Sequence, residues 1–398
     1  MEATPPASAP PKIDPPVPMP GCELGTPVRV PLTADMLGVK RLSRVDSLSI
    51  ARAAGKSLIV FRADGDSGCG HDGCYTSSAY ALEVALGAAP KELPSSGTGI
   101  SPGVDVFALV MGGEVTAVTQ GHRGAAAMAG EHDRLFVMTG GARTLDVRGA
   151  NGGAFVGAAT DSGALVVIAG WEPTRPGPAS GSVRAMTLRG GAKKAPSEVL
   201  AWGMSDERYE EPTLSIDGEK AAAAFVFHRE AGRRCDETNG CFDHTATTRL
   251  EAAWLDASSA AVVGKRTVVA TGAVSGPAVL VRGAELGLIW SEAGALRLSK
   301  WKAGEAAPTA EKLDVAGSEP SVAKAPQWQV AVAFVHDGSV ELGFGGDLGA
   351  AAAAATSAGS GKVRSPHLAL DEGGRGHLVW LEAAARGHDI VHRSVSCR

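Results

Sequence analysis

Aromatic residues are scarce in this sequence, and long hydrophobic runs are absent. Phe, Trp and Tyr make up 5% of the 398 residues, with three tyrosines in all. No stretch of about 18 apolar residues occurs, so no membrane-spanning helix is expected. The formal net charge is −5 and no run of basic residues stands out, which argues against a protein that binds nucleic acid.

Motifs with well-defined chemistry are missing as well. There is no Walker loop, no C-x-x-C and no H-E-x-x-H. Residues 99–103 match the G-x-S-x-G pattern, but a nucleophile elbow needs a helix after the serine, and no helix is expected there. His388 and His392 would lie about 13 Å apart on a strand, too far to share one ion. The sequence therefore predicts no catalytic residues and no metal ligands.

One stretch carries oxygen ligands at alternating positions, as at the start of a calcium loop. It begins at Asp64 and Asp66, but an EF-hand loop ends on a glutamate, and Tyr75 occupies that place. We interpret the stretch as a polar turn and expect no cofactor. A structural calcium ion of another type is the alternative.

An imperfect internal repeat runs through most of the chain. Its clearest copy, Ser365–Ser396, reads as an apolar strand, a turn, a second apolar strand, a polar loop and a third strand. Similar units begin near residues 46, 99, 150, 210, 275, 318 and 364. A spacing of about 40 to 55 residues with four short strands per unit is typical of β-propeller blades. A pair of β-sandwiches would leave the four-strand repeat unexplained.

We therefore predict an all-β fold, a seven-bladed β-propeller of four-stranded antiparallel blades, formed as one domain by residues 22–398. The second strand of each unit is apolar throughout, as expected of a strand buried between neighbouring blades. Residues 99–148 match the repeat least well, so six or eight blades would follow if they are misassigned. Residues 350–355, a run of alanines, are expected to form a loop or a weak outer strand.

The two ends of the chain are expected to meet. The last repeat has only three strands, and Thr26–Leu32 would supply the fourth. Six cysteines allow 15 pairings, but their positions favour Cys22–Cys397, Cys69–Cys74 and Cys235–Cys241. Unpaired buried thiols are the alternative. Three disulfides would place the protein in an oxidising compartment.

Residues 1–21 read as a disordered, proline-rich stem, with eight prolines in the first 20 residues. Such a stem before a disulfide-bonded domain is typical of the tether of an exported protein. We expect a periplasmic, outer-membrane-tethered or extracellular protein, with its signal peptide absent from this sequence, and we expect a monomer.

The longest loops are expected on one face of the propeller. In a four-stranded meander, the loops between second and third strands share one end with the links between blades. Residues 62–75 and 228–242 are the longest of these loops, and each contains a pair of cysteines. Long loops on one rim of a rigid scaffold often carry the binding site.

Polar and aromatic residues at the ends of the second strands would form a ring around the opening of the propeller on this face, which we call the mouth. We interpret them, with residues of the first loop, as a platform for a glycan or peptide, although strand-end packing and simple solvation explain them too. The predicted ligand-binding residues are Arg62, Asp64, Asp66, His71, Tyr75, Trp171, Glu172, His228, Arg229, Trp290, Glu292, His336, Asp337, Trp380 and Glu382.

The pattern Pro-x-φ-x-φ-Asp-x-x-Gly…φ-φ-Trp, best seen at 366–380, resembles that of secreted bacterial propellers of the sialidase-like, BNR-repeat kind. The resemblance covers most of the chain and implies a propeller fold. The Asp-box of that family is not intact. The resemblance implies a catalytic set of three arginines, a tyrosine nucleophile with a glutamate partner, and an aspartate. The tyrosines of this chain, Tyr75, Tyr80 and Tyr209, do not stand in a matching context.

Three hypotheses about function follow. The first is an exported, non-enzymatic propeller that binds a glycan, peptide or surface protein on the face of the disulfide loops. The second is a glycoside hydrolase or lyase of sialidase-like type that uses carboxylates at the same mouth. The third is a structural component of the cell envelope, whose mouth residues would serve packing and salt bridges. We favour the first.

Overall fold

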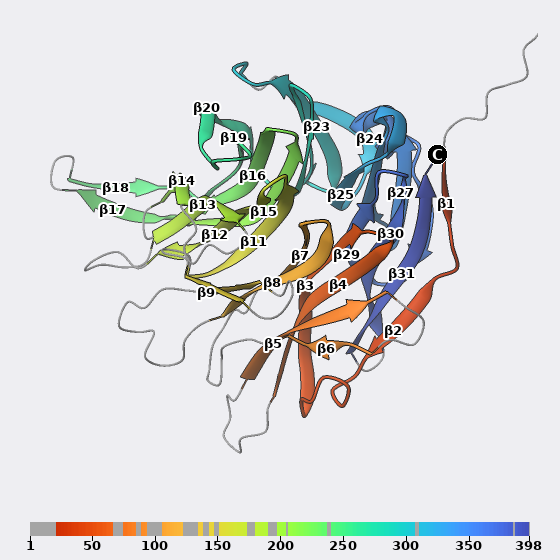
Figure 1. The fold of residues 1–398 in the computed structure, drawn as a ribbon. Coiled ribbons are helices and arrows are strands. Elements are labelled where there is room, and N and C mark those ends of the chain that lie inside the picture. Colours follow the sequence, from red (N-terminus) through yellow and green to blue (C-terminus); the bar gives the residue numbers. More distant parts are fainter. Residues whose placement is uncertain are drawn as a thin grey trace, which may run out of the picture.

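The computed structural model describes residues 21–66, 75–84, 89–93, 106–121, 134–137, 143–146, 151–172, 180–189, 197–203, 206–236, 240–306, 310–384 and 387–397. In these ranges the chain forms almost only antiparallel strands, arranged as a β-propeller (Figure 1). No helix in these ranges is long and apolar enough to cross a membrane.

Six four-stranded sheets follow one another along the chain, and we number them blades 1 to 6. Blades 1 to 3 consist of β3 (Arg41–Ala53), β4 (Lys56–Asp66), β5 (Tyr75–Glu83) and β6 (Lys91–Glu92); β7 (Val106–Met111), β8 (Glu114–Gly121), β9 (Arg134–Val137) and β10 (Arg143–Asp146); and β11 (Asn151–Thr160), β12 (Gly163–Glu172), β13 (Ser180–Arg189) and β14 (Ser197–Trp202). The strands expected in 99–148 are thus confirmed.

Blade 4 carries an insertion between its second and third strands. Blades 4 to 6 consist of β15 (Glu207–Asp217), β16 (Lys220–Arg229), β19 (Thr247–Asp256) and β20 (Val262–Thr271); β21 (Val274–Arg282), β22 (Glu285–Glu292), β23 (Ala295–Lys302) and β24 (Glu311–Ala316); and β25 (Ser318–Lys324), β26 (Val330–His336), β27 (Ser339–Gly345) and β28 (Thr356–Ser360). The insertion is a separate hairpin of β17 (Gly232–Asp236) and β18 (Gly240–His244), which projects away from the blades in Figure 1.

A larger sheet, which we call the closing sheet, joins the two ends of the chain. It contains β29 (Val363–Leu370), β30 (Arg375–Ala384) and β31 (Gly387–Cys397), with β1 (Cys22–Leu24) and β2 (Val28–Leu32) both paired to β31. Figure 1 shows β1 and β2, in red, beside β31, in blue. Cys22 lies opposite Cys397 and forms a disulfide with it. Closure by an N-terminal strand and this disulfide are confirmed.

The prediction of seven four-stranded blades needs correction. Six sheets in the described ranges have four strands, whereas the closing sheet has five. The extra strand arises because the N-terminal segment pairs with β31 in two places, interrupted around Gly25.

The second strands form the core, as their apolar sequences predict. Along β16, Ala223 and Phe225 pack towards blade 3, whereas Ala224 and Val226 pack towards blade 5. Successive side chains point to opposite faces of a strand, so a strand between two blades must be apolar on both faces.

The alanine run was wrongly expected to be a loop or strand. Residues 348–353 form a short helix, α1 (Leu348–Ala353). Alanine has the strongest helix preference, and the Asp347 carboxylate caps the helix by accepting a hydrogen bond from the Ala350 N–H at 2.8 Å. The outer strand of blade 6 is β28, which follows this helix.

Candidate functional site

Charged residues at the mouth are held in ion pairs. The Arg62 guanidinium lies 2.8 Å from an Asp46 oxygen and 3.4 Å from Asp64, and the Asp64 carboxylate also accepts a hydrogen bond from the Ser77 hydroxyl at 2.7 Å. Asp66 ends β4 at an exposed position opposite Tyr75. These predicted site residues therefore gather at one end of blade 1, where they mainly bind one another.

The same pattern recurs around the mouth. His228 lies 3.3 Å from Glu210, and Arg229 donates to the Thr247 hydroxyl at 3.1 Å. Enclosure by the surrounding protein lowers the pKa of His228, against the opposing influence of Glu210. The remaining pairs are Glu292–Arg297 at 3.0 Å, His336–Asp337 at 3.3 Å and Glu382–Arg29 at 2.8 Å.

Two of the tryptophans predicted for the mouth belong to the core instead. The side chain of Trp290 is 0% exposed and that of Trp380 is 1% exposed. A Cβ atom on Gly359, in the neighbouring blade, would lie 2.5 Å from the Trp380 ring, so the indole already fills that space. No aromatic platform is formed at these two positions.

The long loops are described only in part. His71, and with it the cysteine pair Cys69 and Cys74, lies outside the described residues. Tyr75, Trp171 and Glu172 are described as strand residues, but their side chains are not. In the hairpin, Cys241 is disulfide-bonded and lies directly opposite Cys235. The His244 imidazole, 2.7 Å from Asp206, attaches the base of this hairpin to blade 4.

A central channel of about 470 Å³ runs behind the mouth. Its wall is formed by the first strand of every blade and of the closing sheet: Ser47, Leu48, Ser49, Ile50, Val106, Phe107, Ala154, Phe155, Val156, Glu211, Pro212, Thr213, Leu214, Pro277, Ala278, Val279, Pro320, Ser321, Val322, Ser365, His367 and Leu368. None of the predicted mouth residues whose side chains are described lines it, because these residues lie one strand further out.

A ring of β-bulges lies in the first strands that form this channel, on the side towards the mouth. Five first strands have a left-handed residue at the bulge, with φ between 50° and 57°: Ser47, Glu211, Gly276, Glu319 and Ser365. Four of these residues are not glycine, and such backbone is costly for them. Strained backbone persists where surrounding contacts enforce it, and it often lies at functional sites.

Two glutamates of this ring bridge neighbouring sheets. Glu211 of blade 4 accepts a hydrogen bond from the Gly276 N–H of blade 5 at 2.6 Å. Glu319 of blade 6 accepts one from the Ser365 N–H of the closing sheet. In each case one carboxylate oxygen is used, and no hydrogen bond or ion pair with a described residue engages the other. The bulge ring therefore has two carboxylates without a described cationic partner, of which Glu211 lines the channel.

Enclosure changes the acidity of groups in the channel. The pKa of Glu211 is raised because the channel walls enclose its carboxyl group, and the charges of Glu210 and Glu319 raise it further against the Gly276 hydrogen bond. Enclosure also lowers the pKa of His367 to about 4, so its imidazole is neutral at pH 7. Glu211, Glu319 and His367 were not predicted as site residues.

A signal for this ring is visible in the sequence. The left-handed residue precedes a proline in four of the five strands, as in Glu211-Pro212 and Glu319-Pro320. The recurring proline was recognised as part of the repeat, but the residue before it was not. Because the residue before proline usually adopts an extended conformation, the sequence does not predict a left-handed bulge at this position.

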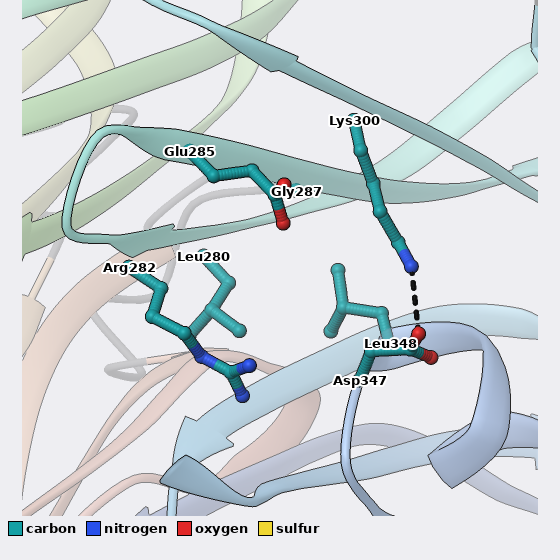
Figure 2. Close-up of a pocket in the computed structure, with 7 residues that line it drawn as sticks. All are labelled: Leu280, Arg282, Glu285, Gly287, Lys300, Asp347 and Leu348. Carbon is teal, nitrogen blue, oxygen red and sulfur yellow. Dashed lines mark hydrogen bonds and ion pairs between the residues drawn. The ribbon is translucent and has the colours of Figure 1, made fainter.

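A smaller hollow between blades 5 and 6 is not a ligand site. Figure 2 shows its lining, in which Lys300 lies 2.9 Å from the Asp347 carboxylate. Its volume of about 20 Å³ leaves room for roughly one water molecule. Within the described part of the chain, no group of three or more His, Cys, Asp or Glu residues is arranged to hold a metal ion.

No family model and no curated protein sequence matches this chain. Solved structures similar to it include a prolyl endopeptidase (12% identity, TM-score 0.44, 87% of this chain and 47% of that one). Others are the Trypanosoma rangeli sialidase with the inhibitor DANA (8%, 0.43, 92% and 59%) and the β-propeller domain of the Trilobed protease from Pyrococcus furiosus (10%, 0.44, 88% and 94%). The chain thus spans about half to three-fifths of the first two. One of these structures is a sialidase, the class that the repeat resembles, but a likeness this low carries no conclusion about activity.

Proposed function

We propose that this protein is an exported, non-enzymatic binding propeller whose ligand enters the central channel from the mouth. The ligand would be a peptide or a surface protein that inserts a basic group, the side chain of a lysine or arginine. The observation that supports this is the pair of carboxylates on the bulge ring, Glu211 and Glu319, for which no described cation compensates. Both residues are exposed, so each can form a charge-assisted hydrogen bond with a cation that the ligand brings.

The bulge ring would orient such a ligand. It lies within the first residues of the inner strands, at the end where β16 leads into the β17–β18 hairpin. A basic group arriving there meets a free oxygen from each glutamate, next to a wall that includes Phe107 and Phe155. Charge-assisted hydrogen bonds to both carboxylates would give selectivity for a cation.

The test is a peptide array in which lysine and arginine are exchanged for glutamine, run beside a glycan array. Glu211→Gln and Glu319→Gln keep the acceptor oxygen for the backbone N–H and remove the charge. We expect binding of basic peptides to weaken about tenfold or more in the double variant. Glu292→Gln, at the mouth but outside the channel, is the matched control. Binding that survives the double variant would place the ligand elsewhere.

A second candidate is a glycoside hydrolase or lyase. A carboxyl group with a raised pKa beside a second carboxylate is the arrangement that general acid catalysis needs, and Glu211 with Glu319 provides it. Release of nitrophenol from aryl glycosides, abolished by Glu211→Gln, would support the enzyme. No turnover of any aryl glycoside, with binding of basic peptides retained, would favour the binding protein.

Three further inferences accompany this proposal. The closing sheet would act as the seventh blade, since β29 contacts both β25 and β3. The Cys22–Cys397 disulfide supports an oxidising compartment, so export remains our proposal. A monomer and a calcium ion near Asp64 and Asp66 stay predictions, which light scattering and metal analysis would check. The proline-rich stem predicted at 1–21 lies, apart from Gly21, outside the described residues.

A further inference from the structure

A second cavity lies at the other end of the propeller, between blade 1 and the closing sheet. Its volume is about 410 Å³. The side chains that matter here are Glu23, Arg52, Arg375, His377, Ser394 and Ser396, all of which line it. Arg52 precedes the turn from β3 to β4, and Arg375 begins β30. First strands end and second strands begin at the end opposite the mouth, so this pocket is separate from the site proposed above.

A chain of hydrogen bonds orients one donor of the pocket. The Arg52 guanidinium donates to the Ser57 hydroxyl oxygen at 3.1 Å, and that hydroxyl lies 3.0 Å from Nδ1 of His377. An arginine can only donate, so the Ser57 oxygen accepts from Arg52 and its own proton is available to Nδ1. In the tautomer in which Nδ1 accepts that proton, the ring proton is on Nε2. No described hydrogen bond uses this N–H.

The histidine stays neutral at pH 7. Burial, His392 and Arg52 together lower the pKa of His377 to about 4. The rings of His377 and His392 are 5.8 Å apart, and His392 is itself buried with a lowered pKa. His377 is therefore uncharged, and its ring can offer an N–H to a ligand.

The positive charge of the pocket comes from the two arginines. Arg52 has an 11% exposed side chain and is held 3.1 Å from Asp371. That aspartate also accepts the backbone N–H groups of Gly373 and Arg375 at 3.0 and 2.9 Å, so it fixes the turn and orients Arg52. The Arg375 side chain is exposed and has no hydrogen bond or ion pair with a described residue. Two carboxylates offset these charges: Asp371, which is already paired with Arg52, and Glu23, which lines the pocket, so Arg375 is the guanidinium group left to bind a ligand.

We propose that this pocket binds a tetrahedral oxyanion, the phosphate or sulfate group of a small ligand. Two guanidinium groups, an imidazole N–H and the hydroxyls of Ser394 and Ser396 come from three different strands. Donors that converge from several directions suit a tetrahedral anion better than a planar carboxylate. The burial of Arg52 and its fixed partner reduce the ordering cost of binding.

The first experiment is titration of the whole protein with inorganic phosphate, sulfate and acetate, followed by ¹⁵N signals of labelled histidine and by calorimetry. We expect saturable binding of phosphate and sulfate, a shift of the His377 Nε2 signal, and much weaker binding of acetate. The ¹⁵N shifts also report the tautomer. Absence of saturable binding overturns the proposal, as does acetate binding as tight as that of phosphate.

Three variants separate a built site from general positive charge. Arg375→Gln should weaken phosphate binding about tenfold, because a charge-assisted hydrogen bond is lost. Glu23→Gln should strengthen it. Lys56→Gln removes a nearby exposed charge that does not line the pocket and should change binding less than twofold. If Lys56→Gln weakens binding as much as Arg375→Gln, the anion responds to net charge alone and the proposal is wrong.

Discussion

The mouth of this propeller and the wall of its channel contain similar residue types in opposite circumstances. At the mouth, Glu382 and Glu292 each lie next to an arginine at 2.8 and 3.0 Å. On the inner strands, Glu211 and Glu319 each accept a hydrogen bond from a backbone N–H and have no described cation beside them. The glutamates at the mouth therefore stabilise the scaffold by pairing with arginines. The carboxylates that can still bind a cation of a ligand lie on the inner strands.

The aromatic residues show the same contrast. Trp290 lies within β22 and Trp380 within β30, before these second strands reach the mouth, and both are in the core. The channel wall has no described tryptophan and contains Phe107 and Phe155 instead. Substitutions at the mouth should therefore mainly change stability, whereas substitutions in the channel should mainly change binding.

The largest expected effect tests the tryptophans. Trp380→Ala should lower the free energy of unfolding by about 3–5 kcal/mol, because it leaves a large cavity in a packed core. Ligand binding by the folded fraction should be unchanged. Urea unfolding measures the cost, and Trp202→Ala, at a side chain 48% exposed, is the control with a small expected effect. An unchanged urea midpoint for Trp380→Ala would contradict the placement of this ring in the core.

Acidification should destabilise the protein through enclosed histidines. The pKa values of His367 and His377 are both about 4, below the ordinary value of about 6.5. As pH falls, the unfolded chain therefore takes up these protons first. The free energy of unfolding should be highest above about pH 6.5 and decline down to about pH 4.

Urea unfolding between pH 4 and 7 checks this dependence. His367→Asn keeps a polar side chain in the channel and should flatten part of the decline, and His377→Asn should flatten another part. His336→Asn, at an exposed residue of the mouth, should leave the curve unchanged. A decline of the same size in all three variants would assign the acid sensitivity to other groups.

The sequence predicted the burial of the second strands and the closure of the propeller. The uninterrupted apolar run of β16 predicted a strand between two blades, and the three-stranded last repeat predicted the pairing of β2 with β31. Cys22 and Cys397 followed from the same closure. These inferences succeed because strand periodicity and burial are local properties of the sequence.

The candidate site was harder to predict from the sequence. A tryptophan followed by a glutamate looks the same in sequence whether the indole faces solvent or, like Trp380, fills the space beside Gly359. The bulge at Glu211 contradicts the usual extended backbone before proline, and it depends on a contact with Gly276 in the next blade. Neither contact is encoded within one repeat.

A smaller change in the free energy of unfolding should distinguish a paired glutamate of the mouth from an unpaired glutamate of the channel, because the two substitutions should change it in opposite directions. Glu382→Gln should lower the free energy of unfolding by at most about 1 kcal/mol, because it weakens the pair with the half-exposed Arg29. Glu211→Gln should raise stability at pH 7, because the raised pKa of Glu211 means that its charged form opposes folding. That gain should shrink as pH falls and wild-type Glu211 is protonated. Urea midpoints at pH 5 and 7 measure both; destabilisation by Glu211→Gln at pH 7 would indicate a cation partner in the channel.

The smallest effect is expected at Glu292, and it is the one that could reverse the comparison. Its pair with Arg297 joins two side chains that are each about a quarter exposed, and such pairs contribute roughly 0.2–1 kcal/mol. Glu292→Gln should therefore shift the urea midpoint slightly at low salt and not at all at high salt, where the pair is screened. Binding of basic peptides should stay at the wild-type level. If instead Glu292→Gln abolished binding while the midpoint held, the ion pair at the mouth would open to take up ligand, and the outer ring, not the channel, would be the binding site.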